Sequence, residues 1–195
     1  MAEEYRQTSV LIVSSGSTAI DYFKGLLLPN RFNPIETAAN AGEAERRVIE
    51  KAFGLVIINT PLPDDFGTKL AINLSRFETT GILLLVKSTL YEEILYKTEN
   101  YGIVTLSKPV DKHTASQTIN ALVSMRNRMQ SFESRVESLE TRMEEIKIVN
   151  RAKLILVERL KMSEPEAHRF IEKSAMDRCV KKREIAENII KTYEN

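Results

Sequence analysis

Five residues stand at or just beyond the ends of short apolar runs, where side chains of a folded sheet could meet and do chemistry. They are Ser14, Ser15, Asn59, Val86 and Lys108. Mg²⁺ needs anionic oxygen ligands in a near-octahedral array, and two hydroxyls with an amide carry no negative charge. An amide is also no nucleophile for phosphoryl transfer, which requires an ionised carboxylate. The set is therefore not expected to hold a metal or to accept a phosphoryl group.

Short apolar runs alternate with amphipathic stretches over residues 8–113. Strands buried on both faces read as continuous apolar runs, so this alternation predicts an α/β fold, a doubly wound parallel sheet of the flavodoxin-like kind. In such folds ligands bind at the carboxyl ends of the strands, where the five residues are expected. The expected strands are 10–13, 34–38, 55–58, 82–86 and 103–106, and the expected helices are 17–28, 42–53 and 65–77.

The order of these elements, with Asn59 at a strand tip and Lys108 after the last run, resembles the receiver domain of two-component response regulators. In that family an acidic pair in the place of Ser14 and Ser15 holds Mg²⁺, and an Asp in the place of Asn59 accepts the phosphoryl group. A hydroxyl residue stands where this chain has Val86, so only Lys108 matches. The resemblance implies a degenerate receiver, or pseudo-receiver, that is not phosphorylated by the usual route.

Two local features lie close to this edge. Asp64 and Asp65 fall beyond the phosphoacceptor position, and we expect them to cap the helix at 65–77 rather than replace the missing acids. The SSGS turn after the first strand could hold an anion on its backbone N–H groups. An ordinary strand-to-helix turn with Ser17 or Thr18 as the helix cap is the favoured interpretation.

Within residues 114–147, apolar residues recur at alternating spacings of three and four without interruption. This spacing is typical of a left-handed coiled coil. Arg128 and Arg135 at g positions would face Glu133 and Glu140 at e positions of a parallel partner, which favours a parallel homodimer. The alternative is a solitary amphipathic helix packed on its own domain. The predicted dimer interface consists of Leu122, Met125, Met129, Phe132, Val136, Leu139, Met143 and Ile146.

The apolar stripe changes phase near residue 147, where the helix is expected to stop packing on a second chain and to pack on its own. Ser163 and Glu166 have capping-box spacing and start a second helix, with Pro165 in its first turn. A third helix follows, so residues 148–195 are predicted to form a three-helix bundle. The expected core residues are Val149, Ala152, Leu156, Leu160, Ala167, Phe170, Ile171, Ser174, Ala175, Ile185, Ala186, Ile189, Ile190 and Tyr193.

A set of residues in this bundle carries a second resemblance: Ala152, Lys153, Leu156, Val157, Ser163, Glu166, Ala167, Ala175, Met176, Ala186, Ile189 and Ile190. In this order they resemble the ANTAR domain of the AmiR and NasR transcription antitermination regulators, although Leu154 replaces a frequent Gly. The resemblance implies a dimer that binds paired stem-loops in nascent leader RNA and prevents the terminator hairpin from forming. It also implies that a partner protein or a ligand controls members with degenerate receivers.

The last segment is basic, since residues 147–195 hold 12 Lys or Arg against 8 Asp or Glu. An excess of cations is a modest indication of an anionic partner such as RNA. Lys153 is the first candidate because it matches the family and occupies a position where the heptad calls for an apolar residue. His168 could stack on a base. The candidate RNA-binding residues are Lys147, Arg151, Lys153, Arg159, Lys161, Arg169, Arg178, Lys181, Lys182 and Arg183.

Several function classes are not supported by the sequence. His113 and His168 are isolated, which argues against metal catalysis, and we expect neither an enzyme nor a cofactor. The single Cys179 excludes an internal disulfide, and no apolar run is long enough for a bilayer, so a cytoplasmic protein is expected. Two alternatives to an RNA-binding regulator remain open: a DNA-binding regulator, and an adaptor whose pseudo-receiver docks a sensor protein.

Overall fold

The computed structural model describes residues 7–77 and 79–193. They form two compact units, one that extends to Ser131 and one that begins at Phe132. Helix α5, Lys112–Leu160, runs through both units without interruption. The predicted coiled-coil segment and the first part of the predicted bundle therefore belong to one helix.

The first unit is built on a parallel sheet of five strands in the order β2-β1-β3-β4-β5. Asn59 stands opposite Leu85, and Lys108 stands opposite Lys87, so the tips of three neighbouring strands lie at one edge. The α/β fold class predicted from the alternating runs is confirmed. The strands are β1 (Thr8–Val13), β2 (Phe32–Ala38), β3 (Leu55–Asn59), β4 (Gly81–Lys87) and β5 (Ile103–Lys108).

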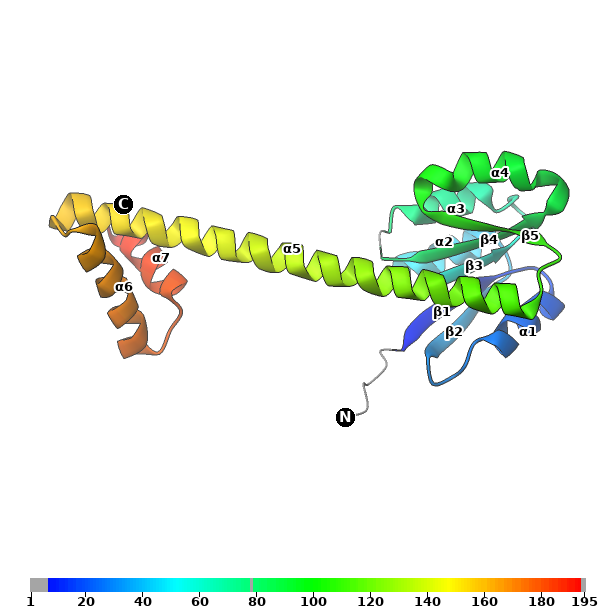
Figure 1. Cartoon of the computed structure of the whole chain (residues 1–195), viewed down its shortest axis with the longest axis horizontal. Coiled ribbons are helices and arrows are strands. Elements are labelled where there is room, and N and C mark those ends of the chain that lie inside the picture. The colour runs from blue at the N-terminus through cyan, green and yellow to red at the C-terminus, as the bar shows by residue number, and fades with distance from the viewer. Residues whose placement is uncertain (1–6, 78, 194–195) are drawn as a thin grey trace. The chain divides into compact units, whose positions relative to one another are not determined.

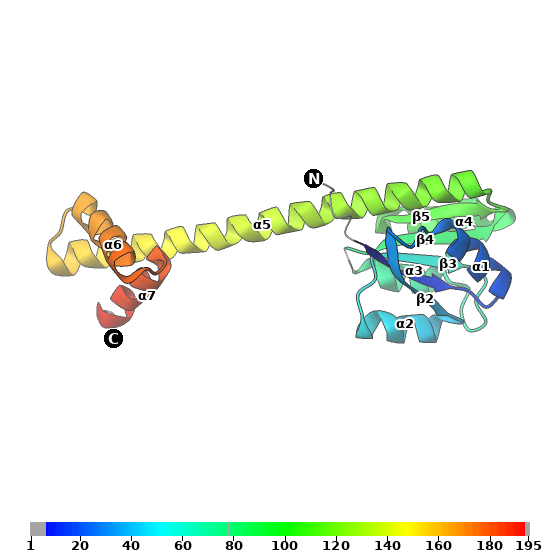
Figure 2. The ribbon, with the colours of Figure 1, turned by 90° about the horizontal axis from the view of Figure 1, so that it is seen from below.

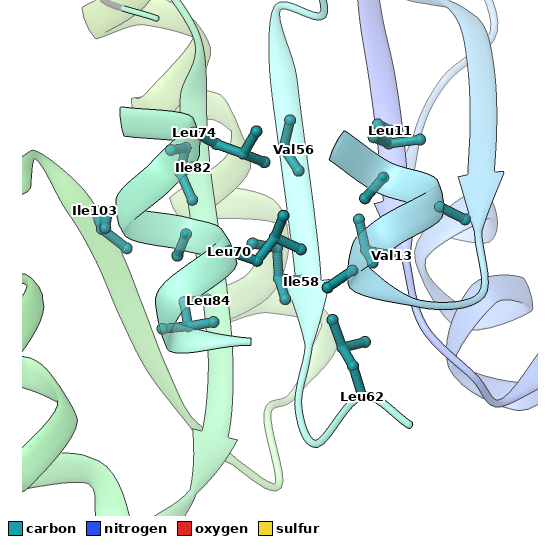
Figure 3. Close-up of a cluster of buried hydrophobic side chains, with 14 of the residues drawn as sticks. Leu11, Val13, Val56, Ile58, Leu62, Leu70, Leu74, Ile82, Leu84 and Ile103 are labelled. Atoms are coloured by element: carbon teal, nitrogen blue, oxygen red, sulfur yellow. The ribbon is translucent and has the colours of Figure 1, made fainter. Parts of the chain in front are cut away.

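Helices cover both faces of the sheet, as Figures 1 and 2 show. On one face, α1 and the first part of α5 pack over residues that include Val10 and Ile57. On the other face, α2, α3 and α4 pack over residues that include Leu11 and Ile58 (Figure 3). Successive strand residues point to opposite faces, so each strand supplies both cores. The helices are α1 (Ser17–Leu26), α2 (Ala41–Glu50), α3 (Thr68–Ser75) and α4 (Tyr91–Thr98), with short 3₁₀ segments at Ser88–Leu90 and Glu99–Tyr101.

Helix α4 was not predicted from the sequence. Its eight residues bury only Ile94 and Thr98, whereas Tyr96 is 78% exposed. The buried Thr98 donates its hydroxyl hydrogen bond to the carbonyl of Ile94 and pairs with Thr105 of β5. Besides Ile94, only the partly buried Tyr91 among the described side chains of α4 packs against the hydrophobic core beneath it, so the helix leaves little apolar periodicity to detect.

The helix caps predicted near this edge of the sheet, for α3 and for α1, are wrong. Asp64 does not cap α3; its carboxylate accepts hydrogen bonds from the backbone N–H groups of Ala41 and Gly42 at the start of α2, both at 2.9 Å. These N–H groups have no partner inside their own helix. At α1 the N-cap residue is Gly16 without a side-chain cap, so neither Ser17 nor Thr18 caps this helix.

Leu122 is a correction to the predicted dimer interface. Its side chain is 5% exposed and lies in the same buried cluster as Ile119 and Val123, against the sheet. Because this part of α5 belongs to the first unit, Leu122 contributes to the receiver core instead of the exposed stripe. The exposed stripe of α5 begins at Met125.

The second unit is a three-helix bundle, made by the end of α5 together with α6 (Glu164–Arg178) and α7 (Lys182–Tyr193). Glu166 reaches back to Ser163 as predicted, and accepts from its backbone N–H at 2.8 Å. Two expected core residues are wrong, because Leu160 and Phe170 are 44% and 43% exposed. The buried residues are Ala152, Ile155, Leu156, Ala167, Ile171, Ala175, Ile185, Ala186 and Ile189.

A sharp turn separates α6 from α7. Cys179 adopts the left-handed conformation, with φ of 55°, and the N–H of Val180 donates to the carbonyl of Ala175 at 3.0 Å. This arrangement is the helix C-terminal turn in which glycine is the usual residue. The turn brings the segment before α7 back alongside the end of α6.

Candidate functional site

Three of the five strand-end residues are joined by hydrogen bonds in the first unit. The amide of Asn59 donates to the hydroxyl oxygen of Ser14 at 3.1 Å, and the ammonium of Lys108 donates to the amide oxygen of Asn59 at 3.0 Å. Lys108 also donates to the carbonyl of Thr60. The chain's own residues therefore use the polar groups that would otherwise face a metal or a phosphoryl group.

The other two residues play no part in this network. Val86 is fully buried in the core beneath α2, α3 and α4, and Ser15 is exposed. Burial, and secondarily the positive charge of Lys87, lower the pKa of Lys108. A carboxylate partner would have the opposite effect on this pKa.

The two nearby aspartates do not restore an acidic site. The N–H groups of Gly42 and Ala41 hold the pKa of Asp64 below its usual range, since they stabilise its charged form at the start of α2. The prediction that Asp65 caps α3 is also wrong, because the N-cap residue is Gly67 and has no side-chain cap; Asp65 accepts a hydrogen bond from the N–H of Gly67. Among the described residues, no group of three or more His, Cys, Asp or Glu side chains could hold a metal ion.

The second unit contains a groove of about 970 Å³ between the end of α5, helix α6 and the turn before α7. Both aliphatic side chains and cations line it. The predicted residues Lys153, Lys181 and Lys182 all lie along it. The lining residues are Arg142, Glu145, Ile146, Val149, Asn150, Lys153, His168, Glu172, Ala175, Met176, Cys179, Val180, Lys181 and Lys182.

Carboxylates pair with the cations of this groove. The ammonium of Lys153 lies 3.0 Å from Glu164, and its side chain is only 16% exposed. Glu172 is paired with Lys182 and lies 3.3 Å from the imidazole of His168. Hydrogen bonds from Lys153 and from Lys182 hold the pKa values of Glu164 and Glu172 below their usual range. The groove therefore contains ion pairs that a stronger anion could replace.

The remaining predicted RNA-binding residues lie outside the groove. Lys147 is paired with Glu144 at 3.8 Å, and Arg183 with Glu187 at 2.7 Å. Arg178 lines a smaller cavity of about 200 Å³ on another side of the bundle. The rest are exposed on the surface, namely Arg151, Arg159, Lys161 and Arg169.

Sequence reasoning missed two groove residues, Arg142 and Asn150. Both could have been found from the heptad, because Arg142 occupies the same g position as Arg128 and Arg135, and Asn150 falls on the first a position after the phase change. The face of α5 that forms the predicted seam thus continues into the groove.

Residues 137–190 match the ANTAR domain family, and they include every lining residue of the groove. The chain carries an ANTAR domain. The match begins eleven residues before the predicted bundle boundary at 148, so the family domain includes the last heptads of α5 as well as α6 and most of α7. Three of the ten predicted RNA-binding cations, Lys153, Lys181 and Lys182, line this groove within the matched residues.

Solved structures similar to the first unit include several receiver domains. The signal receiver domain of an HD domain-containing protein from Pseudomonas fluorescens Pf-5 aligns with a TM-score of 0.60 and 22% identity, over 67% of this chain and 97% of that one. A CheY-like receiver domain protein from Methanospirillum hungatei JF-1 aligns with a TM-score of 0.56 and 22% sequence identity, over 63% of this chain and 98% of that one. The chemotaxis response regulator CheY4 of Vibrio cholerae aligns with a TM-score of 0.52 and 22% sequence identity, over 60% of this chain and 98% of that one. At these identities the likeness shows the receiver fold alone.

A search of curated proteins found no match to the chain. In the described part of the chain, no helix has both the length and the apolar character that crossing a membrane requires.

Proposed function

We propose that this chain is a cytoplasmic, dimeric transcription antitermination regulator. Its ANTAR domains bind stem-loops in nascent leader RNA and so prevent a terminator hairpin from forming. A signal other than phosphorylation acts through the degenerate receiver. The observation that carries this proposal is the groove of the ANTAR domain, whose lining includes Lys153, Lys181 and Lys182.

The chemistry of the groove suits a hairpin loop. Side chains cannot read the deep major groove of A-form RNA, so proteins recognise loops, whose unstacked bases offer both faces and edges. Val149 and the exposed Met176 offer an apolar surface for a base, and Asn150 can donate and accept hydrogen bonds at a base edge. The lysine ammonium groups can bind the phosphates. RNA phosphates would take the place that Glu164 holds at Lys153 in the free protein.

Exposed apolar residues on α5 support dimerisation. From Met125 to Ile146, seven residues on the predicted seam are between 47% and 64% exposed. Soluble monomers rarely expose a continuous apolar surface of this length. A second copy in a parallel coiled coil would cover it and place two ANTAR domains on one RNA. The stripe consists of Met125, Met129, Phe132, Val136, Leu139, Met143 and Ile146.

The receiver edge supports control without phosphorylation. Asn59 is an amide with both its groups bonded, to Ser14 and to Lys108. The carboxylates of Asp64 and Asp65 are occupied by backbone N–H groups, those of Ala41 and Gly42 for Asp64 and that of Gly67 for Asp65. A receiver built this way can still transmit a signal from a bound partner or ligand, since this requires no Mg²⁺ and no phosphoryl group.

The proposal is tested by binding of the full chain to a library of small RNA hairpins, with DNA duplexes of matched sequence, across a series of salt concentrations. We expect selection of a loop sequence, and a salt slope that decreases by about one phosphate contact in Lys153→Ala. Arg46→Ala is the matched control, because Arg46 is an exposed cation of α2 in the receiver unit. Equal binding of RNA and duplex DNA would favour a DNA-binding regulator. Weak binding of both would favour an adaptor that docks a sensor protein.

A further inference from the structure

A second cavity lies in the receiver unit, at the carboxyl edge of the sheet, and has a volume of about 550 Å³. Helix α1 forms one wall, and the loop from β5 to α5 forms the other. Parallel α/β sheets place their ligands at this edge. The lining residues are Thr18, Ala19, Tyr22, Phe23, Asn59, Leu85, Lys108, Pro109 and Val110.

Most of this lining is hydrocarbon. The accessible hydrocarbon belongs to Ala19, Tyr22, Pro109 and Val110, which are partly buried or exposed. Phe23 and Leu85 lie behind them in the core beneath α1, at 2% and 1% exposed. The hydroxyl of Tyr22 donates to the carbonyl of Val110 at 3.0 Å, so its polar group is already satisfied. The cavity therefore offers a hydrophobic surface to a ligand, with polar groups gathered at Asn59 and Lys108.

Among the described residues that line the cavity, Lys108 alone carries a positive charge. An ammonium group has three donors. In the described part of the chain its partners are Asn59 and Thr60, which are both neutral acceptors. Its pKa is lowered by burial and by Lys87, so an anion bound beside it would stabilise the charged form. The charge of this cavity is thus suited to an anion, whereas an acidic phosphoacceptor site is suited to Mg²⁺.

We propose that this cavity binds a small monocarboxylate with an apolar body. Its carboxylate accepts a hydrogen bond from Lys108, and its body packs against the accessible apolar atoms of Ala19, Tyr22 and Val110. The volume lies within the range of about 300–1,000 Å³ usual for small-molecule sites. This inference goes beyond the proposed function, because binding at this cavity does not depend on RNA.

Inorganic phosphate is a poorer occupant than a carboxylate. A phosphate dianion needs several charged or N–H donors around its oxygens. Here the described lining holds one cation, Lys108, and the hydroxyl oxygen of Ser14 already accepts hydrogen bonds from Asn59 and from the N–H of Gly16. A carboxylate needs fewer donors, and an aliphatic or aromatic body fills the rest of the cavity.

The test is calorimetric titration of the full chain with phenylacetate, its neutral isostere phenylacetamide, and inorganic phosphate. We expect phenylacetate to bind and phenylacetamide to bind at least about tenfold more weakly, since only the carboxylate pairs with Lys108. Lys108→Met should weaken phenylacetate binding by a similar factor. Ala19→Trp should abolish binding by filling the cavity, while Lys24→Met, an exposed cation of α1 outside the lining, should not change it.

Three results would overturn the assignment. One is the absence of saturable phenylacetate binding up to about 10 mM, a concentration that reveals millimolar affinities. Another is equal binding of the acid and the amide. The third is phenylacetate affinity that survives both Lys108→Met and Ala19→Trp, which would place the ligand elsewhere. Circular dichroism of each variant verifies its fold, and Lys108→Met decides the question if Ala19→Trp does not fold. None of these results depends on whether the chain binds RNA.

Discussion

Leu122 and Met125 occupy consecutive positions of one heptad pattern on helix α5, but their side chains are 5% and 64% exposed. Leu122 packs against the sheet of the receiver unit with Ile119 and Val123. One turn further along, Arg126 still donates from its guanidinium to the carbonyl of Thr79 at 2.7 Å. The same apolar stripe thus serves the receiver core at its beginning and is exposed from Met125 onward.

Truncating these two residues should have different effects. We expect Leu122→Ala to lower the free energy of unfolding of the receiver unit by about 2–4 kcal/mol, because it leaves a cavity in a packed core. Met125→Ala removes an exposed side chain and should change this free energy by less than about 0.5 kcal/mol. Urea unfolding followed by circular dichroism measures both. Equal losses in the two variants would show that Leu122 is not part of the receiver core.

Charges placed on the exposed stripe should separate the dimer. Val136→Lys combined with Leu139→Lys should yield monomers in light scattering and should weaken binding to paired hairpins at least about tenfold. Ser134→Lys with Thr141→Lys adds the same charge at two exposed f positions, away from the seam, and should remain dimeric. Tight binding of paired hairpins by the monomeric variant would remove the dimer from the proposed mechanism.

Restoring the phosphoacceptor alone should not restore phosphorylation. In Asn59→Asp, the residues Ser14 and Ser15 still supply no charge for Mg²⁺, so we expect no Mg²⁺-dependent labelling by radiolabelled acetyl phosphate. A receiver that is readily phosphorylated serves as the positive control in the same assay. Stable labelling of Asn59→Asp that requires Mg²⁺ would contradict this account of the degenerate edge.

The carboxylate that caps α2 should make the receiver unit sensitive to acid. The folded-state pKa of Asp64 is lowered, so its contribution to stability is complete above the unfolded value of about 3.9 and is lost as the pH falls through the folded value. Asp64→Ala should therefore melt at a lower temperature than the parent at pH 7, and at nearly the same temperature near pH 2. Thermal unfolding at the two pH values measures this difference. A difference that persists unchanged in acid would show that the charge is irrelevant.

The ion pair at Lys153 should restrain RNA binding. Glu164→Gln removes the competing charge, and we expect the affinity for RNA hairpins to rise about two- to fivefold. Glu158→Gln makes the same change in net charge at an exposed position of α5 outside the groove. Filter binding at two salt concentrations compares the variants. An equal rise in RNA affinity in Glu164→Gln and Glu158→Gln would show that the effect comes from the overall charge and not from the ion pair at Lys153.

The residues that could be predicted from the sequence are those whose environment is set by local pattern. Continuous apolar runs place Asn59 and Lys108 at strand tips because buried parallel strands admit few polar residues. The capping-box spacing places Glu166 at the start of α6 for an equally local reason. The ANTAR resemblance rests on residues spread through all three helices of the bundle, and the family match confirms it.

The errors concern contacts between distant parts of the chain. Asp64 caps a helix that begins 23 residues earlier in the sequence, and no local signal distinguishes this from capping the next helix. Leu122 and Met125 both fit the heptad pattern, so the sequence does not distinguish them. Leu122 is buried and Met125 is exposed because only Leu122 packs against the sheet. The pairing of Lys153 with Glu164 likewise depends on how α6 returns along α5.

The turn between α6 and α7 also has a practical consequence. Cys179 is exposed, lines the groove of the ANTAR domain and is the only cysteine in the sequence. A thiol-reactive fluorophore will therefore attach to the native chain at a single known position beside Lys182. Changes in its emission will report directly on occupancy of the groove, without any engineered residue.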